Sequence, residues 1–179
     1  MIILIGESGS GKTTILNELE KRGYEKAMNH TTRPKREREE MLGEYRFVTK
    51  EQFEQMWERG ELLQRAEFNG EYYGISTNSL KENTCCIQIV DSIQDVKNKA
   101  KQLGKENISI KTFYLYVPPE ERTKRMLKRG DSIEKIQERL ILDKEKFKNV
   151  KQVADYIIEN EQVNKTVDEI IQLYENKSC

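Results

Sequence analysis

The amino-acid sequence predicts an α/β fold in three layers, with a parallel central sheet between two layers of helices. Segments with the pattern of buried strands alternate along the chain with segments that have the apolar period of helices. A glycine-rich loop joins the first of these strands to the first helix. Residues from about 31 to 80 depart from the alternation, which predicts a small α+β insertion over the sheet. The length of 179 residues suits a single domain.

The first half of the chain combines core elements with the insertion. Thr49 is placed to cap a helix that Gly60 then ends. The pair Asn69-Gly70 is typical of a tight hairpin turn. The predicted elements are a strand over 2–5, a helix from 12 to about 22, an extended piece over 24–28, a strand over 47–49, the helix after it and a hairpin over 62–73.

The parallel pattern resumes in the second half. Pro118-Pro119 stops the strongest strand-forming segment, and the Ser132 hydroxyl can cap a long helix. The predicted elements are a strand over 85–90 that closes at Asp91, a helix over 93–103, a strand over 108–117, a helix over 120–128, a helix from 132 to about 150, a strand over 155–158 and a helix over 163–174.

Composition excludes several classes of protein. Basic and acidic residues both number 31, so no positive field indicates a nucleic-acid partner. The apolar N-terminal stretch is far too short for a membrane span and lacks the cationic start of a signal peptide. The three cysteines form no plausible disulfide framework, and no His/Cys cluster has zinc spacing. The cytoplasm is the expected location.

The loop after the first strand has the Walker A spacing G-x-x-x-x-G-K-[ST] over residues 6–13. Its glycines let the backbone approach a phosphate, and the following helix directs its N-terminal N–H groups at the anion. Lys12 is placed to reach the β- and γ-phosphates, and the Thr13 hydroxyl to ligate Mg²⁺. A turn that merely caps a helix is the alternative, but the flanking strand and helix favour a P-loop NTPase fold. The predicted triphosphate ligands are Gly6, Ser8, Gly9, Ser10, Gly11, Lys12, Thr13 and Thr14.

Cations are concentrated in residues 30–38, which show no apolar periodicity. Guanidinium groups bind phosphate through paired hydrogen bonds and stay charged at any working pH. Most charge runs are solvated loops. In a chain that already carries a phosphate-binding loop, a second phosphate-binding role is about equally favoured.

Several short motifs follow the Walker loop in a fixed order. They are Thr31-Thr32-Arg33 with Arg36, Gly43 to Val48, Gly60-Glu61-Leu62, Ala66-Glu67-Phe68, Gly70 to Gly74, Lys128-Arg129-Gly130, Arg139-Leu140 and Tyr156 to Asn160. Together they resemble the guanylate kinase family over nearly the whole chain. The resemblance implies a kinase that phosphorylates a nucleoside monophosphate, GMP or dGMP first, with ATP and Mg²⁺.

The resemblance also implies a division of labour within the single domain. The insertion, approximately residues 31–80, would bind the acceptor, while residues 1–30 and 81–179 form the core with a lid at about 125–142. Arg129 and Arg139 match lid residues that close over the phosphates, so they join Lys12 as expected catalytic residues. Asn160 matches a position near the adenine of ATP. The expected acceptor ligands are Arg33, Arg36, Tyr45, Gln64, Tyr73 and Asp91.

Two groups of residues have competing interpretations. Asp91 ends a predicted strand, where its carboxylate can hold Mg²⁺ through water, contact the acceptor or cap the next helix. Arg122 and Arg125 lie on a predicted lid helix, and surface charge is the slightly favoured interpretation for both.

The base-reading side departs from the family pattern. The family has Glu where this chain has Gln64, and a carboxamide accepts and donates where a carboxylate only accepts. Ile75 and Asn29 also replace small hydroxyl residues. The acceptor is therefore open between GMP, a monophosphate with another base, and ribose 1,5-bisphosphate. A guanylate-kinase-like module that binds proteins without catalysis is a further alternative, which the intact Lys12 and Thr13 disfavour.

Overall fold

The core of the molecule is a five-stranded, wholly parallel sheet with the strand order β2-β7-β1-β8-β9. The computed structural model describes residues 1–35, 45–68 and 70–176. The strands are β1 (Ile2–Ile5), β2 (Glu25–Lys26), β7 (Thr84–Ile87), β8 (Lys111–Tyr116) and β9 (Tyr156–Glu159). Parallel strands need crossover connections, which explains the alternation of strand and helix patterns in the sequence.

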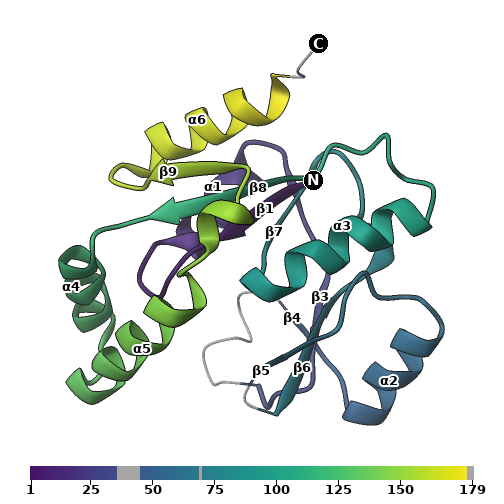
Figure 1. The fold of residues 1–179 in the computed structure, drawn as a ribbon, viewed down its shortest axis with the longest axis horizontal. Helices are drawn as coiled ribbons and strands as arrows, with labels where there is room; N and C mark the ends of the chain where they lie inside the picture. Colours follow the sequence, from purple (N-terminus) through teal and green to yellow (C-terminus); the bar gives the residue numbers. More distant parts are fainter. Residues whose placement is uncertain (36–44, 69, 177–179) are drawn as a thin grey trace.

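Strand β1 is buried on both faces at the centre of this sheet. Ile3 and Ile5 belong to one apolar cluster, which α3 (Ile93–Gln102) covers. Ile2 and Leu4 belong to the other cluster. That second cluster is covered by α1 (Lys12–Lys21) and α6 (Val163–Glu175). Figure 1 shows α6 and α3 on opposite sides of the sheet, so the predicted three-layer architecture is confirmed.

A second, four-stranded sheet with the order β4-β3-β6-β5 lies beyond the core. Its strands are β3 (Asn29–Thr31), β4 (Tyr45–Phe47), β5 (Ala66–Phe68) and β6 (Glu71–Ile75), and α2 (Lys50–Glu58) connects β4 to β5. Strands β5 and β6 form the predicted antiparallel hairpin, in which Gly70 has φ 74°. Thr49 and Gln52 form a reciprocal capping box on α2. The insertion therefore has the expected mixed α and β character.

Two helices project from the core after β8. They are α4 (Pro119–Arg129) and α5 (Ile133–Lys146). Gly130 ends α4 with φ 94°, and the Ser132 hydroxyl accepts the N–H of Lys135 at 3.4 Å, as predicted. Helix α5 ends at Lys146, short of the predicted Val150, which begins a separate 3₁₀ turn (η4, Val150–Gln152). Figure 1 shows this helical pair and the second sheet extending to the same side of the core.

The predicted strand over 85–90 is too long. Strand β7 ends at Ile87, and Val90–Ser92 form a 3₁₀ turn (η3) that contains Asp91. The Ser92 N–H donates to the Ile89 carbonyl at 3.1 Å, which turns the chain from the sheet into α3. The apolar character of Ile89 and Val90 does not reveal this turn, because a short apolar run is compatible with the end of a strand and with a buried turn.

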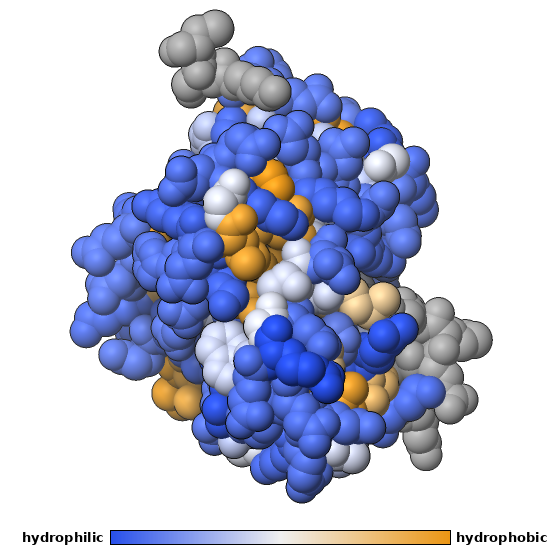
Figure 2. Space-filling view, turned by 90° about the vertical axis from the view of Figure 1, so that its right-hand side faces the viewer, coloured by the Kyte–Doolittle hydropathy of each residue, from blue (hydrophilic) through white to orange (hydrophobic). Residues whose placement is uncertain are grey.

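The face seen in Figure 2, which is the side of α2 and α3, is mostly hydrophilic, with a small apolar patch in the upper middle of the view. Within the described residues, no helix has both the length and the apolar character that crossing a membrane requires.

Phe113 provides a test of the core. Its side chain is fully buried on β8 and stacks on Tyr156 with ring centroids 5.1 Å apart. We expect Phe113→Ala to lower the free energy of unfolding by about 3–5 kcal/mol, because it removes buried apolar area and leaves a cavity. Denaturant titration checks this through a lower midpoint at an unchanged slope. Ile141→Ala is the control: Ile141 is 72% exposed, so an equal loss there would contradict the assignment of the core.

Candidate active site

The glycine-rich loop leaves the carboxyl end of β1 and enters α1 at the centre of the sheet. Gly9 and Gly11 have φ angles of 80° and 87°, in the left-handed region that glycine tolerates best. A Cβ on Gly9 would lie 2.9 Å from the carbonyl oxygen of Arg122. The loop therefore packs against the backbone of α4, and the glycine there is required by contact as well as by conformation.

Lys12 is folded back over this loop. Its ammonium group donates to the carbonyl oxygens of Gly6 at 2.6 Å and Glu7 at 3.0 Å. Loss of hydration lowers the pKa of Lys12 to about 8, although the carboxylates of Asp143 and Glu7 oppose this shift. Lys12 therefore remains mostly cationic at neutral pH, in a position to exchange two carbonyl partners for phosphate oxygens.

Asn160 supports the loop from the β9 side. Its amide nitrogen donates to the Ser10 carbonyl at 2.7 Å, and its amide oxygen accepts the Thr166 hydroxyl at 3.0 Å. Arg125 donates to the Asn160 carbonyl at 3.2 Å. Both polar atoms of the buried Asn160 side chain are thus engaged in holding the loop, and its contact with adenine stays a prediction.

Arg122 is buried, so its interpretation as surface charge is wrong. Its side chain is 4% exposed and pairs with Glu7 at 3.2 Å and with Asp143 at 3.5 Å. The Tyr114 hydroxyl donates to the other oxygen of Glu7 at 2.8 Å. Arg122 lies one turn before buried Met126 on the inward face of α4, and this spacing is the signal that sequence reasoning missed.

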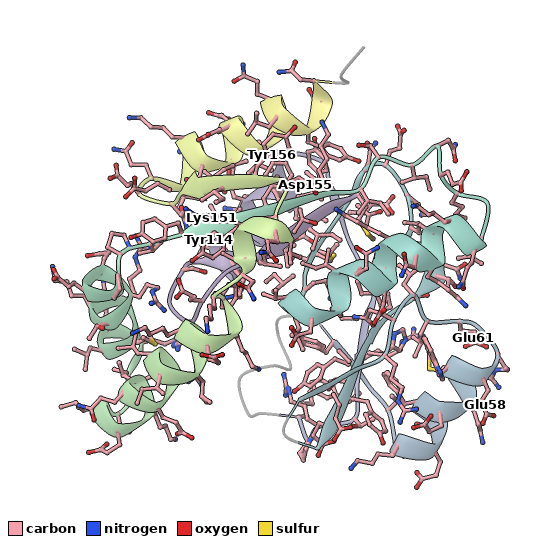
Figure 3. All side chains as sticks on the ribbon, viewed as in Figure 1. Glu58, Glu61, Tyr114, Lys151, Asp155 and Tyr156 are labelled. Carbon is pink, nitrogen blue, oxygen red and sulfur yellow. The ribbon has the colours of Figure 1, made fainter. Side chains whose placement is uncertain are left out.

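Tyr114 connects this group of charges to the sheet. It lies on β8, beside the segment of chain that follows α5, as Figure 3 shows. Its ring stacks on Phe147, with ring centroids 5.6 Å apart. Burial raises the pKa of the Tyr114 hydroxyl well above its usual range, and the hydrogen bond to Glu7 adds to this effect. The hydroxyl therefore stays protonated and remains a donor to Glu7.

The two expected lid arginines lie near one carboxylate. Arg129 forms an ion pair with Asp131 just after α4, and this contact is the main cause that lowers the pKa of Asp131. Half-buried Arg139, on α5, lowers that pKa further through its charge. Arg129 and Arg139, two of the three expected catalytic residues, thus lie near Asp131 on the α4–α5 pair. Arg129 also interacts electrostatically with the third, Lys12, at the loop.

Three of the expected acceptor ligands come together on the second sheet. The Arg33 guanidinium carbon lies 5.2 Å from the centre of the Tyr45 ring. The rings of Tyr45 and Tyr73 meet edge to face, with centroids 6.3 Å apart. The fourth expected ligand of the acceptor phosphate, Arg36, lies outside the described residues.

Gln64 is buried beside a residue that the sequence reasoning did not select. Its amide nitrogen donates to the Gln88 side-chain oxygen at 2.7 Å. Gln88 in turn donates its own amide nitrogen to the Ile87 carbonyl at 2.8 Å, and its oxygen also accepts the Ser92 hydroxyl at 3.1 Å. Because the Ile87 carbonyl can only accept, Gln88 must turn its oxygen toward Gln64. The Gln64 oxygen then has no hydrogen-bond partner among the described residues.

Asp91 is exposed on η3 and does not end a strand. It lines a cavity of about 480 Å³ between the start of α3 and the segment after α5, together with Lys97, Glu145 and Asp155. Its expected parts in metal or acceptor binding therefore stay predictions.

The pKa of Lys12 leads to a test of the loop. Below pH 8 the ammonium is charged and attracts a triphosphate; above it the charge is lost, so ATP affinity should fall by up to about tenfold per pH unit. Calorimetric titration with ATP above about pH 7 checks this, because phosphate is fully ionised there. Lys12→Arg keeps its charge throughout and should remove the dependence. An equal slope in that variant would assign the titration to another group.

Comparison with known proteins agrees with this geometry. The model of the family described as Guanylate kinase matches residues 1–177. The guanylate kinase of Shouchella clausii is 32% identical, with 100% of this chain and 88% of the relative covered. That of Halalkalibacterium halodurans is 31% identical, with 100% and 89% covered.

Two solved structures resemble the fold. The crystal structure of guanylate kinase from Anaplasma phagocytophilum has a TM-score of 0.69 at 23% identity, covering 100% of this chain and 87% of that one. Shikimate kinase from Acinetobacter baumannii, in complex with shikimate, has a TM-score of 0.54 at 21% identity, covering 96% and 90%. The family match spans almost the whole chain and includes both the loop and the second sheet; the chain belongs to the guanylate kinase family.

Proposed function

We propose that this protein transfers the γ-phosphoryl group of ATP to GMP or dGMP. The observation that carries the choice of acceptor is the buried, unpartnered oxygen of Gln64. A buried acceptor without a partner is costly, and a ligand that donates a hydrogen bond there recovers that cost.

The pairing of Gln64 with Gln88 changes what Gln64 offers to a base. A free carboxamide would present a donor and an acceptor, which suits adenine or uracil. Here the donor is already used by Gln88, so only the acceptor remains. Guanine is the base whose pairing edge carries two adjacent donors, N1–H and N2–H₂. The amide pair therefore supports guanine, although Gln64 lacks the carboxylate expected for it.

Phosphoryl transfer requires positioning and positive charge more than covalent chemistry. Lys12 would take the β- and γ-phosphates, and Arg129 and Arg139 would neutralise the charge that spreads over the transferred group. Arg33 with Tyr45 and Tyr73 supplies the donors for the acceptor's phosphate. The attacking phosphate oxygen is already anionic, so no general base is needed.

Magnesium fits the residues present. Among the described parts of the chain, no group of three His, Cys, Asp or Glu side chains could hold a metal. Mg²⁺ is commonly held by one or two protein oxygens together with water and substrate phosphates. Thr13 is exposed at the start of α1 and would supply one such oxygen, with Asp91 as a second ligand through water. The ion would neutralise charge on the β- and γ-phosphates.

The alternative acceptors and the non-catalytic module are not favoured. The relatives named above are called guanylate kinases, and the P-loop and the lid arginines are intact. The buried thiols of Cys85 and Cys86 are free, in keeping with the reducing cytoplasm proposed as the location.

An ADP-release assay with ATP and Mg²⁺ tests the function. The acceptors compared are GMP, dGMP, AMP, UMP, dTMP and ribose 1,5-bisphosphate. We expect GMP or dGMP to give the highest kcat/KM, and Lys12→Ala to abolish turnover. A higher value for any other acceptor would reject the proposed substrate.

Gln64→Leu tests the base contact itself. Removing the acceptor should lower kcat/KM for GMP by roughly 10–100-fold, because guanine would leave a donor unpaired, while the KM for ATP should change little. Steady-state kinetics with each substrate varied checks this. Gln102→Leu is the matched control, since Gln102 is exposed at the end of α3. Unchanged GMP kinetics in Gln64→Leu would show that the base is read elsewhere.

A further inference from the structure

A carboxylate of the lid lies against the phosphate-binding loop. Asp143, on α5, accepts the backbone N–H of Ser8 at 2.7 Å, and its side chain is only 13% exposed. Residues 8 and 143 are far apart in sequence, so the contact joins the lid directly to the loop. A backbone N–H of a Walker loop is the kind of donor that binds a phosphate oxygen. Here a carboxylate oxygen occupies such a donor.

The same carboxylate is one of two that pair with Arg122 among the described residues. Arg122 lies closer to Glu7, at 3.2 Å, than to Asp143, at 3.5 Å. It also donates to the Ser8 carbonyl at 3.4 Å, while its Nε has no hydrogen-bond partner among the described residues. The Tyr114 hydroxyl donates a hydrogen bond to the carboxylate oxygen of Glu7 that does not face Arg122. Arg122 would therefore keep a carboxylate partner if Asp143 moved away, and would present unused donors to another anion.

The charge of Asp143 acts on the same cation that a triphosphate needs. Asp143 is the largest electrostatic contribution that favours the charged form of Lys12. A triphosphate in the loop would bring several negative charges close to the Asp143 carboxylate. Because both groups would be largely shielded from water, they would repel each other. Asp143 and the donor phosphates therefore compete for Ser8, Arg122 and Lys12.

We infer that the Asp143 carboxylate occupies hydrogen-bond donors that a phosphate of ATP would otherwise bind. This competition sets how strongly the site binds ATP. In the nucleotide-free protein Asp143 satisfies the Ser8 amide and balances the cations around the loop. When the triphosphate enters, Asp143 gives up these contacts, which removes its direct hydrogen bond between α5 and the loop. This role rests on the proposed use of the loop for ATP.

Asp143→Asn separates this role from simple structural support. Asparagine has nearly the same shape and can still accept from Ser8, but it has no charge. We expect the dissociation constant for Mg·ATP to fall about tenfold, and that for inorganic tripolyphosphate to fall by a similar factor, because the competition concerns phosphate alone. Calorimetric titration without acceptor at pH 7, below the pKa of Lys12, measures both. The unfolding midpoint without nucleotide should fall, since Arg122 and Ser8 lose a charged partner.

Opposite changes in stability and affinity are the distinguishing result, because a purely structural residue would lose both. Asp168→Asn is the matched control: Asp168 is exposed on α6, pairs with Arg22 at 2.9 Å, and should leave both dissociation constants unchanged. Asp143→Ala removes the same charge together with the acceptor for Ser8, and it should also lower both dissociation constants, which gives a second test of the charge.

Unchanged or weaker binding of both phosphates by the Asp143 variants would overturn the inference, even with full GMP kinase activity in the wild type. Tighter phosphate binding by these variants in a protein inactive on GMP would instead uphold the inference and reject the proposed acceptor.

Discussion

The burial of β1 on both faces is the constraint on which the rest of the structure depends. Its side chains alternate between the two apolar clusters, so the strand has to be central, with β7 and β8 as its neighbours. The glycine-rich loop then emerges between the ends of those neighbours. Parallel sheets bind ligands at this carboxyl edge. Gln88 follows β7 and α4 follows β8, so the groups on either side of the loop are placed by the same strand order.

The glycine-rich loop is held from two sides, by neutral hydrogen bonds on one side and by charged contacts on the other. On one side the Asn160 side chain binds the Ser10 carbonyl and accepts the Thr166 hydroxyl, both through neutral hydrogen bonds. On the other side the contacts are charged and include Asp143 on the projecting helix α5. An arriving anion acts more strongly on charged contacts than on neutral hydrogen bonds. The loop therefore has a fixed support and one that is sensitive to its ligand.

The sequence predicted the features that depend on local pattern. The Walker spacing located the loop, apolar periods located the strands and helices of the core, and turn residues located the hairpin and the cap at Ser132. The limit of β7 was missed because Ile89 and Val90 look like a strand although the chain turns there. The charged group around Arg122 was missed because its members come from three distant segments. Nothing in a single sequence pairs such residues, although the spacing from Arg122 to Met126 indicates the buried face.

The pair of Gln64 and Gln88 shows that the replacement of the family's Glu by Gln64 has to be interpreted together with the side chain beside it. Gln64 by itself suggests a change of base, because a free carboxamide both donates and accepts. Gln88 uses the donor, and the Ile87 carbonyl determines the direction of the whole chain of amides. What remains is a neutral group that only accepts, as a carboxylate does. A neutral acceptor is cheaper to bury than a carboxylate, and it adds no repulsion toward the acceptor's own phosphate. Under the proposed contact with guanine, the site would keep the direction of its hydrogen bonds while losing their charge, which would weaken the contact without reversing the preference.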